Sequence, residues 1–170
     1  SGTVIFDDVS NSNEADSGGI KVLAPATLQM LPGGDIVDAS HDLNSVGIVD
    51  VIGTMIVDTG DTANQRNVAA KLAVSGLLHI QRGHFKFEMG CDTTGFILVE
   101  DAAVLELGSD GGGKDAPCFM RAGTELRAFG DAFVSGGNNA VAGVYNRTLT
   151  TRLTGGALTF KASAAIANLG

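Results

Sequence analysis

Residues 77–107 read LLHIQRGHFKFEMGCDTTGFILVEDAAVLEL, and this stretch decides the fold of the chain. Apolar and polar residues alternate in short runs that end at a glycine or a small polar cluster, which is the pattern of β-strands with one buried face. A small residue followed by two apolar residues on one face occurs at 83–87 (GHFKF) and again at 103–107 (AVLEL). The two runs start 20 residues apart (103 − 83). We interpret them as two successive rungs of one stacked structure.

The same pattern recurs along the chain and gives four more candidate rungs. They begin at Ala26, Gly53, Thr124 and Gly156. The intervals between successive rungs cluster near about twenty or about thirty residues, as expected for a solenoid coil that sometimes carries an inserted loop. Turn-forming residues predict such loops at 33–42, 58–67 and 135–139.

The runs 76–80, 83–87 and 155–160 resemble the coils of right-handed parallel β-helices. Autotransporter passenger domains, filamentous adhesins and bacteriophage tail or capsid-decorating proteins have this architecture. The resemblance implies an all-β fold, a short right-handed parallel β-helix (β-solenoid) forming a single domain over residues 20–170. Residues 1–19 are polar after a short apolar start and are expected to form an N-terminal extended arm. The alternative is an antiparallel β-sandwich or jelly roll, which also uses short alternating strands between turns.

Both ends of the chain carry further expectations. Residues 4–6 read as a short strand, and residues 161–168 predict either a capping helix or a last strand. The N-terminal sequence SGTVIFDD lacks the basic and apolar regions of a signal peptide. Either a signal was removed or none existed, and we favour the second reading.

Composition and charge limit the classes of partner. At 170 residues the chain fits one domain, and 24 glycines with 5% aromatic residues suit many short strands. The net charge of -8 repels phosphate backbones, so we expect no nucleic-acid partner. No run reaches the roughly 18 apolar residues that would span a bilayer, so we expect no membrane partner.

Residues 108–114 (GSDGGGK) fit the spacing of a phosphate-binding loop. However, Asp115 stands where magnesium binding needs Ser or Thr, and Pro117 follows where a helix should begin. We interpret the segment as a glycine-rich turn between coils.

Other polar residues do not form a convincing chemical site. His79 and His84 alternate with apolar residues, which predicts that they face outward, and no third metal ligand lies at a suitable spacing. Four acids are candidates for a sugar-cleaving pair: Glu88, Glu100, Asp101 and Glu106. Basic residues are scattered among these acids as on a solvated surface, whereas such an enzyme needs paired acids in a groove. We therefore expect no catalytic residues, no cofactor and no metal.

Two cysteines and several apolar residues are assigned structural roles. Cys91 and Cys118 lie 27 residues apart (118 − 91), a little more than one coil. We favour two buried thiols there, and a disulfide between adjacent coils is the alternative. Apolar residues predicted to face outward or to lie in the arm are candidates for intersubunit contact: Val4, Ile5, Phe6, Leu77, Phe96, Phe119 and Phe133.

The functional expectation follows from the resemblance and from the lack of a chemical signature. We expect a non-enzymatic structural protein: a bacteriophage capsid decoration or cementing protein on the virion surface. It would be a homotrimer bound to the major capsid protein or to other virion subunits. One alternative is a secreted or cell-surface adhesin or glycan-binding module. A third reading is a polysaccharide-active β-helix enzyme.

Overall fold

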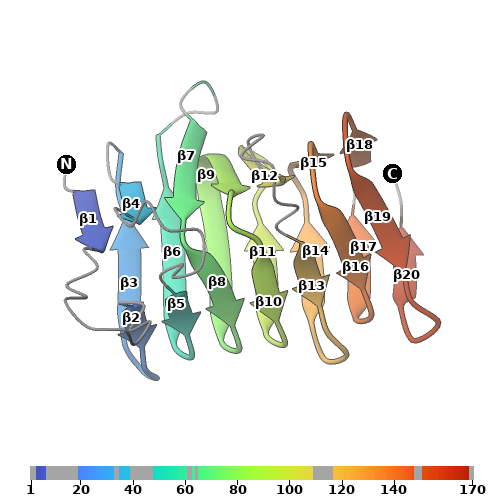
Figure 1. Cartoon of the computed structure of the whole chain (residues 1–170), viewed down its shortest axis with the longest axis horizontal. Helices are drawn as coiled ribbons and strands as arrows, with labels where there is room; N and C mark the ends of the chain where they lie inside the picture. The colour runs from blue at the N-terminus through green and yellow to red at the C-terminus, as the bar shows by residue number, and fades with distance from the viewer. Residues whose placement is uncertain are drawn as a thin grey trace, which may run out of the picture.

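The computed structural model describes residues 3–6, 19–32, 35–38, 48–60, 63, 65–108, 117–147 and 151–168. Every regular element in this part of the chain is a β-strand, and the strands pair in parallel between stacked coils (Figure 1). The predicted β-solenoid is therefore confirmed, and the antiparallel sandwich is wrong. Among the described residues there is no helix of the length and hydrophobicity needed to cross a membrane.

The strands form three faces, and the chain visits them in the order A, B, C in each coil. Face A consists of β1 (Thr3–Phe6), β4 (Asp35–Asp38), β7 (Gln65–Ala69), the second half of β9 (Leu77–Phe87), β12 (Ala103–Leu107), β15 (Asp131–Val134) and β18 (Thr151–Leu153). Face B consists of β2 (Gly19–Val22), β5 (Ile48–Val51), β8 (Lys71–Val74), β10 (Cys91–Thr93), β13 (Cys118–Met120), β16 (Asn138–Val141) and β19 (Ala157–Phe160). Face C consists of β3 (Thr27–Met30), β6 (Thr54–Asp58), the first half of β9, β11 (Phe96–Val99), β14 (Glu125–Ala128), β17 (Val144–Arg147) and β20 (Ala165–Asn168).

The central pair of rungs lies as predicted. Phe85 of β9 is opposite Leu105 of β12, and Phe87 is opposite Leu107. All four side chains point inward and are buried. The rings of Phe85 and Phe87 also pack edge to face, with centroids 5.3 Å apart.

The order of the other predicted rungs is partly wrong. The run 53–57 is stacked on Leu77–Ile80 of β9, not on the run 83–87, and β12 is stacked on β15, not on the run 124–128. The reason is that the same small-then-apolar pattern occurs on all three faces. The pattern therefore identifies a strand but not the face to which it belongs.

The small residues of the pattern lie at corners, where successive coils touch through their backbones. Gly53, Gly76 and Gly95 follow the face B strands of three successive coils. A Cβ on Gly76 would lie 2.1 Å from the Gly53 carbonyl oxygen, and one on Gly95 would lie 2.2 Å from the Gly76 oxygen. No side chain fits at that spacing. The corner requires glycine because of this close approach.

The two ends of the described chain are strands. β1 pairs with β4 on face A, so the expected strand at residues 4–6 exists and lies next to the second coil. Gly19 already belongs to β2, and residues 7–18 of the expected arm lie outside the described residues. At the other end β20 pairs with β17, so residues 165–168 form a last strand and not a capping helix.

Candidate functional site

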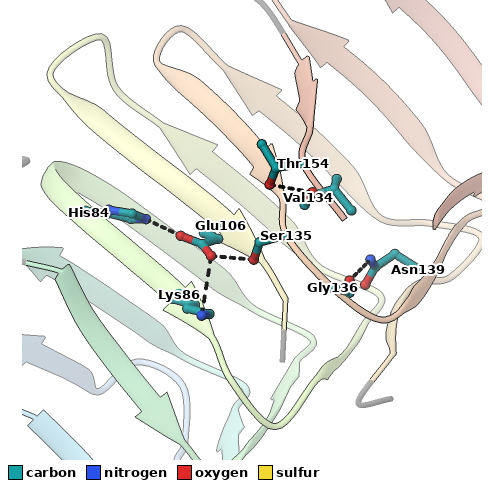
Figure 2. A network of polar contacts seen from close by, with 8 residues as sticks. All are labelled: His84, Lys86, Glu106, Val134, Ser135, Gly136, Asn139 and Thr154. Carbon is teal, nitrogen blue, oxygen red and sulfur yellow. Dashed lines mark hydrogen bonds and ion pairs between the residues drawn. The ribbon is translucent and has the colours of Figure 1, made fainter. Parts of the chain in front are cut away.

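A network of polar side chains lies on the outer side of face A (Figure 2). Phe85 and Leu105 point inward, so the alternation of β9 and β12 turns His84, Lys86 and Glu106 outward. The strand register sets Lys86 opposite Glu106. The Lys86 Nζ lies 3.4 Å from one carboxylate oxygen of Glu106, and the His84 Nε2 lies 2.7 Å from the other.

Glu106 is the centre of this network. The Ser135 hydroxyl donates a hydrogen bond to the same oxygen that faces Lys86. Although they point away from the core, Glu106 is only 8% exposed and Lys86 only 3% exposed. Burial alone would raise the pKa of Glu106, but Ser135, the Lys86 charge and His84 together hold the pKa below its usual value. The carboxylate is therefore charged and held from both sides.

This arrangement differs from that of a nucleophilic hydrolase. In a Ser-His-acid triad the imidazole stands between the hydroxyl and the acid and takes the hydroxyl proton. Here Glu106 stands between Ser135 and His84, and an ammonium group neutralises it. The network is built to join three neighbouring coils through β9, β12 and the end of β15.

The two histidines of β9 have separate partners. His79 Nε2 lies 2.8 Å from a carboxylate oxygen of Glu100, while His84 contacts Glu106. They do not converge on one point, and the described residues contain no cluster of three or more His, Cys, Asp or Glu suited to a metal ion.

Three of the four acids singled out in the sequence, Glu100, Asp101 and Glu106, lie in separate surroundings. Glu100 pairs with His79 and Glu106 belongs to the face A network. Asp101 is exposed and lines an open hollow of about 460 Å³ at the corner between faces C and A, together with Arg82 and Asp131. In that hollow the Arg82 guanidinium is bound in a bidentate manner by Asp58 of β6, at 3.1 and 3.2 Å.

A second feature is an apolar cluster on the outer side of face C. Leu77 lies directly opposite Phe96, while Ile56 and Leu98 lie opposite His79 from the coils on either side. We call Ile56, Leu77, Phe96 and Leu98 the C-face patch. All four side chains are partly exposed, and they occupy neighbouring outward positions on the hydrogen-bonded strands β6, β9 and β11.

Charged groups border the C-face patch. The Arg127 guanidinium lies over the Phe96 ring, 5.6 Å from its centroid, and donates to Glu125 at 2.7 Å. The His79–Glu100 pair lies along the same face. The Leu77–Phe96 pair is thus flanked by polar groups that are already paired, and one of them, His79, lies between Ile56 and Leu98.

The sequence predicted only half of this patch. Leu77 and Phe96 were expected to face outward, and the structure brings them together. Ile56 and Leu98 were missed. Their signal is alternation within the strands, since Met55, Val57, Ile97 and Val99 on either side of them are buried.

The other residues expected to make intersubunit contacts lie on different faces. Phe119 is 37% exposed on face B, where the Arg121 guanidinium lies 5.3 Å from the ring centroid. Phe133 belongs to β15 on face A, and residues 4–6 belong to β1 at the edge of the same face. The structure therefore does not gather these residues into one surface.

Cys91 and Cys118 are directly opposite each other on β10 and β13. The structure joins them in a disulfide. The favoured prediction of two buried thiols is therefore wrong, and the alternative, a disulfide between adjacent coils, agrees with the structure. Both residues are buried, and the bond links positions 27 residues apart. It closes one coil, which includes the glycine-rich segment 108–114; residues 109–116 lie outside the described residues.

Comparison with known proteins identifies no relative: no family model, no curated protein and no solved structure matches this chain. The three faces, their ion pairs and the C-face patch are therefore the features from which a function is inferred.

Proposed function

We propose that this chain is a non-enzymatic structural protein that binds other protein subunits through the C-face patch. The observation that carries the proposal is the patch itself: Leu77 lies opposite Phe96 on a hydrogen-bonded sheet, and Ile56 and Leu98 lie on either side of His79 in the next outward column. Protein interfaces have an apolar centre that includes aromatic residues, surrounded by a polar rim. A sheet that is already ordered loses little conformational entropy when it is covered.

The placement of charges on the outer surface supports a structural role. Glu106 is neutralised by Lys86 of the preceding coil. On face B, Arg121 of one coil donates two hydrogen bonds to Asp92 of the coil before it, and this contact lowers the pKa of Asp92. These carboxylates hold neighbouring coils together, which favours a stiff module over a reactive one.

The specific form that we propose is a decoration protein of a bacteriophage capsid, acting as a homotrimer on the major capsid protein or on other virion subunits. Covering the C-face patch removes apolar area from water and stabilises the bound lattice by mass action, without chemistry. The net charge of -8 keeps the remaining surface solvated.

The test compares two aromatic residues that differ in face. Phe96 and Phe119 both face outward and both lie beneath an arginine, at 5.6 and 5.3 Å from the respective guanidinium. We expect Phe96→Ala to weaken subunit binding at least tenfold and Phe119→Ala to leave it unchanged. The measurements are the native mass in solution and co-sedimentation with undecorated capsids.

Each outcome of this test has a consequence. A trimer that co-sediments with capsids and is lost in Phe96→Ala supports the decoration role. A trimer that is broken by Phe96→Ala but ignores capsids keeps the structural role and rejects the virion. A monomer that ignores capsids and is retained on a glycan array contradicts both proposals and favours the adhesin reading.

A further inference from the structure

A hollow lies on the outer side of face B. Its centre is Ala73 of β8, which lies between Asp50 of β5 and Asp92 of β10. These three strands are successive in the face B sheet, so the backbones of the two acids lie roughly 9.5 Å apart (Figure 1). Because the alanine methyl group is shorter than the two acidic side chains, the surface is hollowed at this point, with a volume of about 300 Å³. That volume is at the lower end of the range for small-molecule sites.

The lining of this face B hollow combines polar groups with an apolar wall. Lys71 and the two hydroxyl-bearing residues Ser75 and Thr94 border it, and all three residues are exposed. Ile48, with 41% of its surface exposed, supplies the apolar wall. Hydroxyl groups both donate and accept hydrogen bonds, and an ammonium group only donates. One small volume therefore presents a cation, hydroxyls, carboxylate acceptors and an apolar surface.

Both acids are neutralised by cations from neighbouring coils. The Lys21 Nζ of the preceding coil lies 3.6 Å from a carboxylate oxygen of Asp50. Arg121 of the following coil donates two hydrogen bonds to Asp92, at 2.8 and 2.6 Å, and lowers the pKa of that acid. A carboxylate has about four lone-pair sites, so each acid keeps acceptor capacity for a ligand.

Lys71 differs from these paired groups. In the described part of the chain its ammonium group makes no hydrogen bond or ion pair, and it acts on Asp92 only through its charge. The charges of Lys21, Lys71 and Arg121 against those of Asp50 and Asp92 sum to +1 (3 − 2), whereas the whole chain carries -8. The face B hollow is therefore a local positive site on an acidic protein, and its one unneutralised charge is that of Lys71.

We propose that the face B hollow binds an acidic sugar residue, such as a uronic or sialic acid, with the sugar carboxylate on Lys71. One ammonium group matches one negative charge, whereas the second charge of a phosphate would lie beside Asp50 and Asp92. The sugar hydroxyls donate to the remaining lone pairs of these two acids and accept from Thr94, and the C–H groups of the ring cover Ile48. The inference goes beyond the proposed function, because it assigns a small-molecule site on a face that the C-face patch does not use.

Titration of the full chain, followed by two-dimensional amide NMR, tests the site. The probes are the methyl glycosides of glucuronic, galacturonic and N-acetylneuraminic acid, and the methyl esters of the same compounds are the uncharged controls. We expect at least one acid to bind with a Kd of about 1 mM and to shift the amide signals of Ala73 and Thr94. Its ester should bind at least tenfold more weakly. Absence of binding by all three acids at millimolar concentrations, or equal binding by the esters, overturns the proposal.

Two simpler anions separate the contributions of charge and ring. Acetate carries the carboxylate without the sugar ring, and inorganic phosphate carries a higher charge without the ring. Both should bind at least tenfold more weakly than the best acidic sugar. If either anion binds as tightly as the sugar, the assignment of an acidic sugar is wrong.

Three variants locate the contact. Lys71→Met removes the ammonium group and keeps most of the side-chain length, and Ala73→Leu fills the hollow at an outward position; each should abolish binding of the acid. Lys161→Met is the matched control, because Lys161 is also exposed and follows β19, four strands away in the same sheet. It should bind like the wild type. Circular dichroism verifies that each variant folds, and binding that persists in Lys71→Met or in Ala73→Leu overturns the proposal.

The face B hollow and the C-face patch can be tested separately. Lys71→Met should keep the native mass and the capsid co-sedimentation of the wild type, and Phe96→Ala should bind the sugar normally. A chain that binds an acidic sugar but does not assemble rejects the proposed function and retains the sugar site. A chain that assembles but binds none of the acids retains the proposed function and rejects the sugar site.

Discussion

Replacing Gly76 by alanine tests the idea that the corners between faces B and C are closed by backbone contact. A Cβ at this position would lie 2.1 Å from the Gly53 carbonyl oxygen and 2.2 Å from the Ile52 oxygen. Neither oxygen belongs to a side chain that can rotate away. Gly76 does not have a left-handed φ, so the cost is steric and not conformational.

The expected cost follows from what must move. Relieving the overlap requires a shift of about 1 Å between two coils, since Cβ contacts below roughly 3 Å are not tolerated. The shift strains the hydrogen bonds from Gly76 N to Val51 O, 2.9 Å, and from Leu77 N to Gly53 O, 3.0 Å. Two such bonds contribute about 2 kcal/mol, and overpacking adds about 1 to 3 kcal/mol. We therefore expect a loss of about 4 kcal/mol, or about 10 °C in Tm.

Gly123→Ala is the matched control. Gly123 has φ +99°, and a Cβ there would lie 3.5 Å from its nearest neighbour, the Thr94 carbonyl oxygen. Its cost is therefore conformational and should be about 1 to 2 kcal/mol. Urea unfolding followed by circular dichroism measures both variants. If Gly76→Ala is no less stable than Gly123→Ala, the close approach of the coils at this corner is incorrect.

Three further predictions concern the interior and the face A network. Glu106→Gln should cost roughly 3 kcal/mol at pH 7, because it removes the carboxylate that neutralises the buried Lys86. Because the folded pKa of Glu106 is lowered, the stability lost in Glu106→Gln is present above the ordinary pKa of 4.5 and should shrink as the pH falls below that value. Equal losses of stability at pH 3 and pH 7 contradict a charged Glu106 in the folded protein. Changing both Cys91 and Cys118 to serine should cost about 3.5 kcal/mol through loop closure over 27 residues, and alkylation with and without reductant, followed by mass spectrometry, checks the bond. Leu105→Ala, at a position with no exposed surface, should cost about 3 kcal/mol in urea unfolding, and a loss below 1 kcal/mol contradicts its place in the core.

Alternation in the sequence was sufficient to predict the fold class and one correct rung. The runs 83–87 and 103–107 are separated by 20 residues, and they pair residue for residue. The prediction failed for the run 124–128, which lies on face C while β12 lies on face A. Three corners per coil create three sets of similar strands, and the length of each connecting loop decides which strands meet. Loop length is visible in the sequence, but the face on which a loop begins is not.

The candidate sites show the same limit. Period-two alternation correctly predicted that Leu77 and Phe96 point outward, but their position opposite each other depends on the register between coils. Glu106 was grouped with other acids because its outward direction was readable. The burial of Glu106 could not be predicted from the sequence, because alternation gives the direction of a side chain but not the residues that cover it.

Ion pairs between neighbouring coils hold the middle of this solenoid together. Asp58 binds Arg82, Glu106 faces Lys86 and Asp92 binds Arg121, and each pair joins neighbouring coils. In a stacked structure each coil contacts only the coils beside it, so an inner coil has two neighbours to satisfy its charges and its apolar columns.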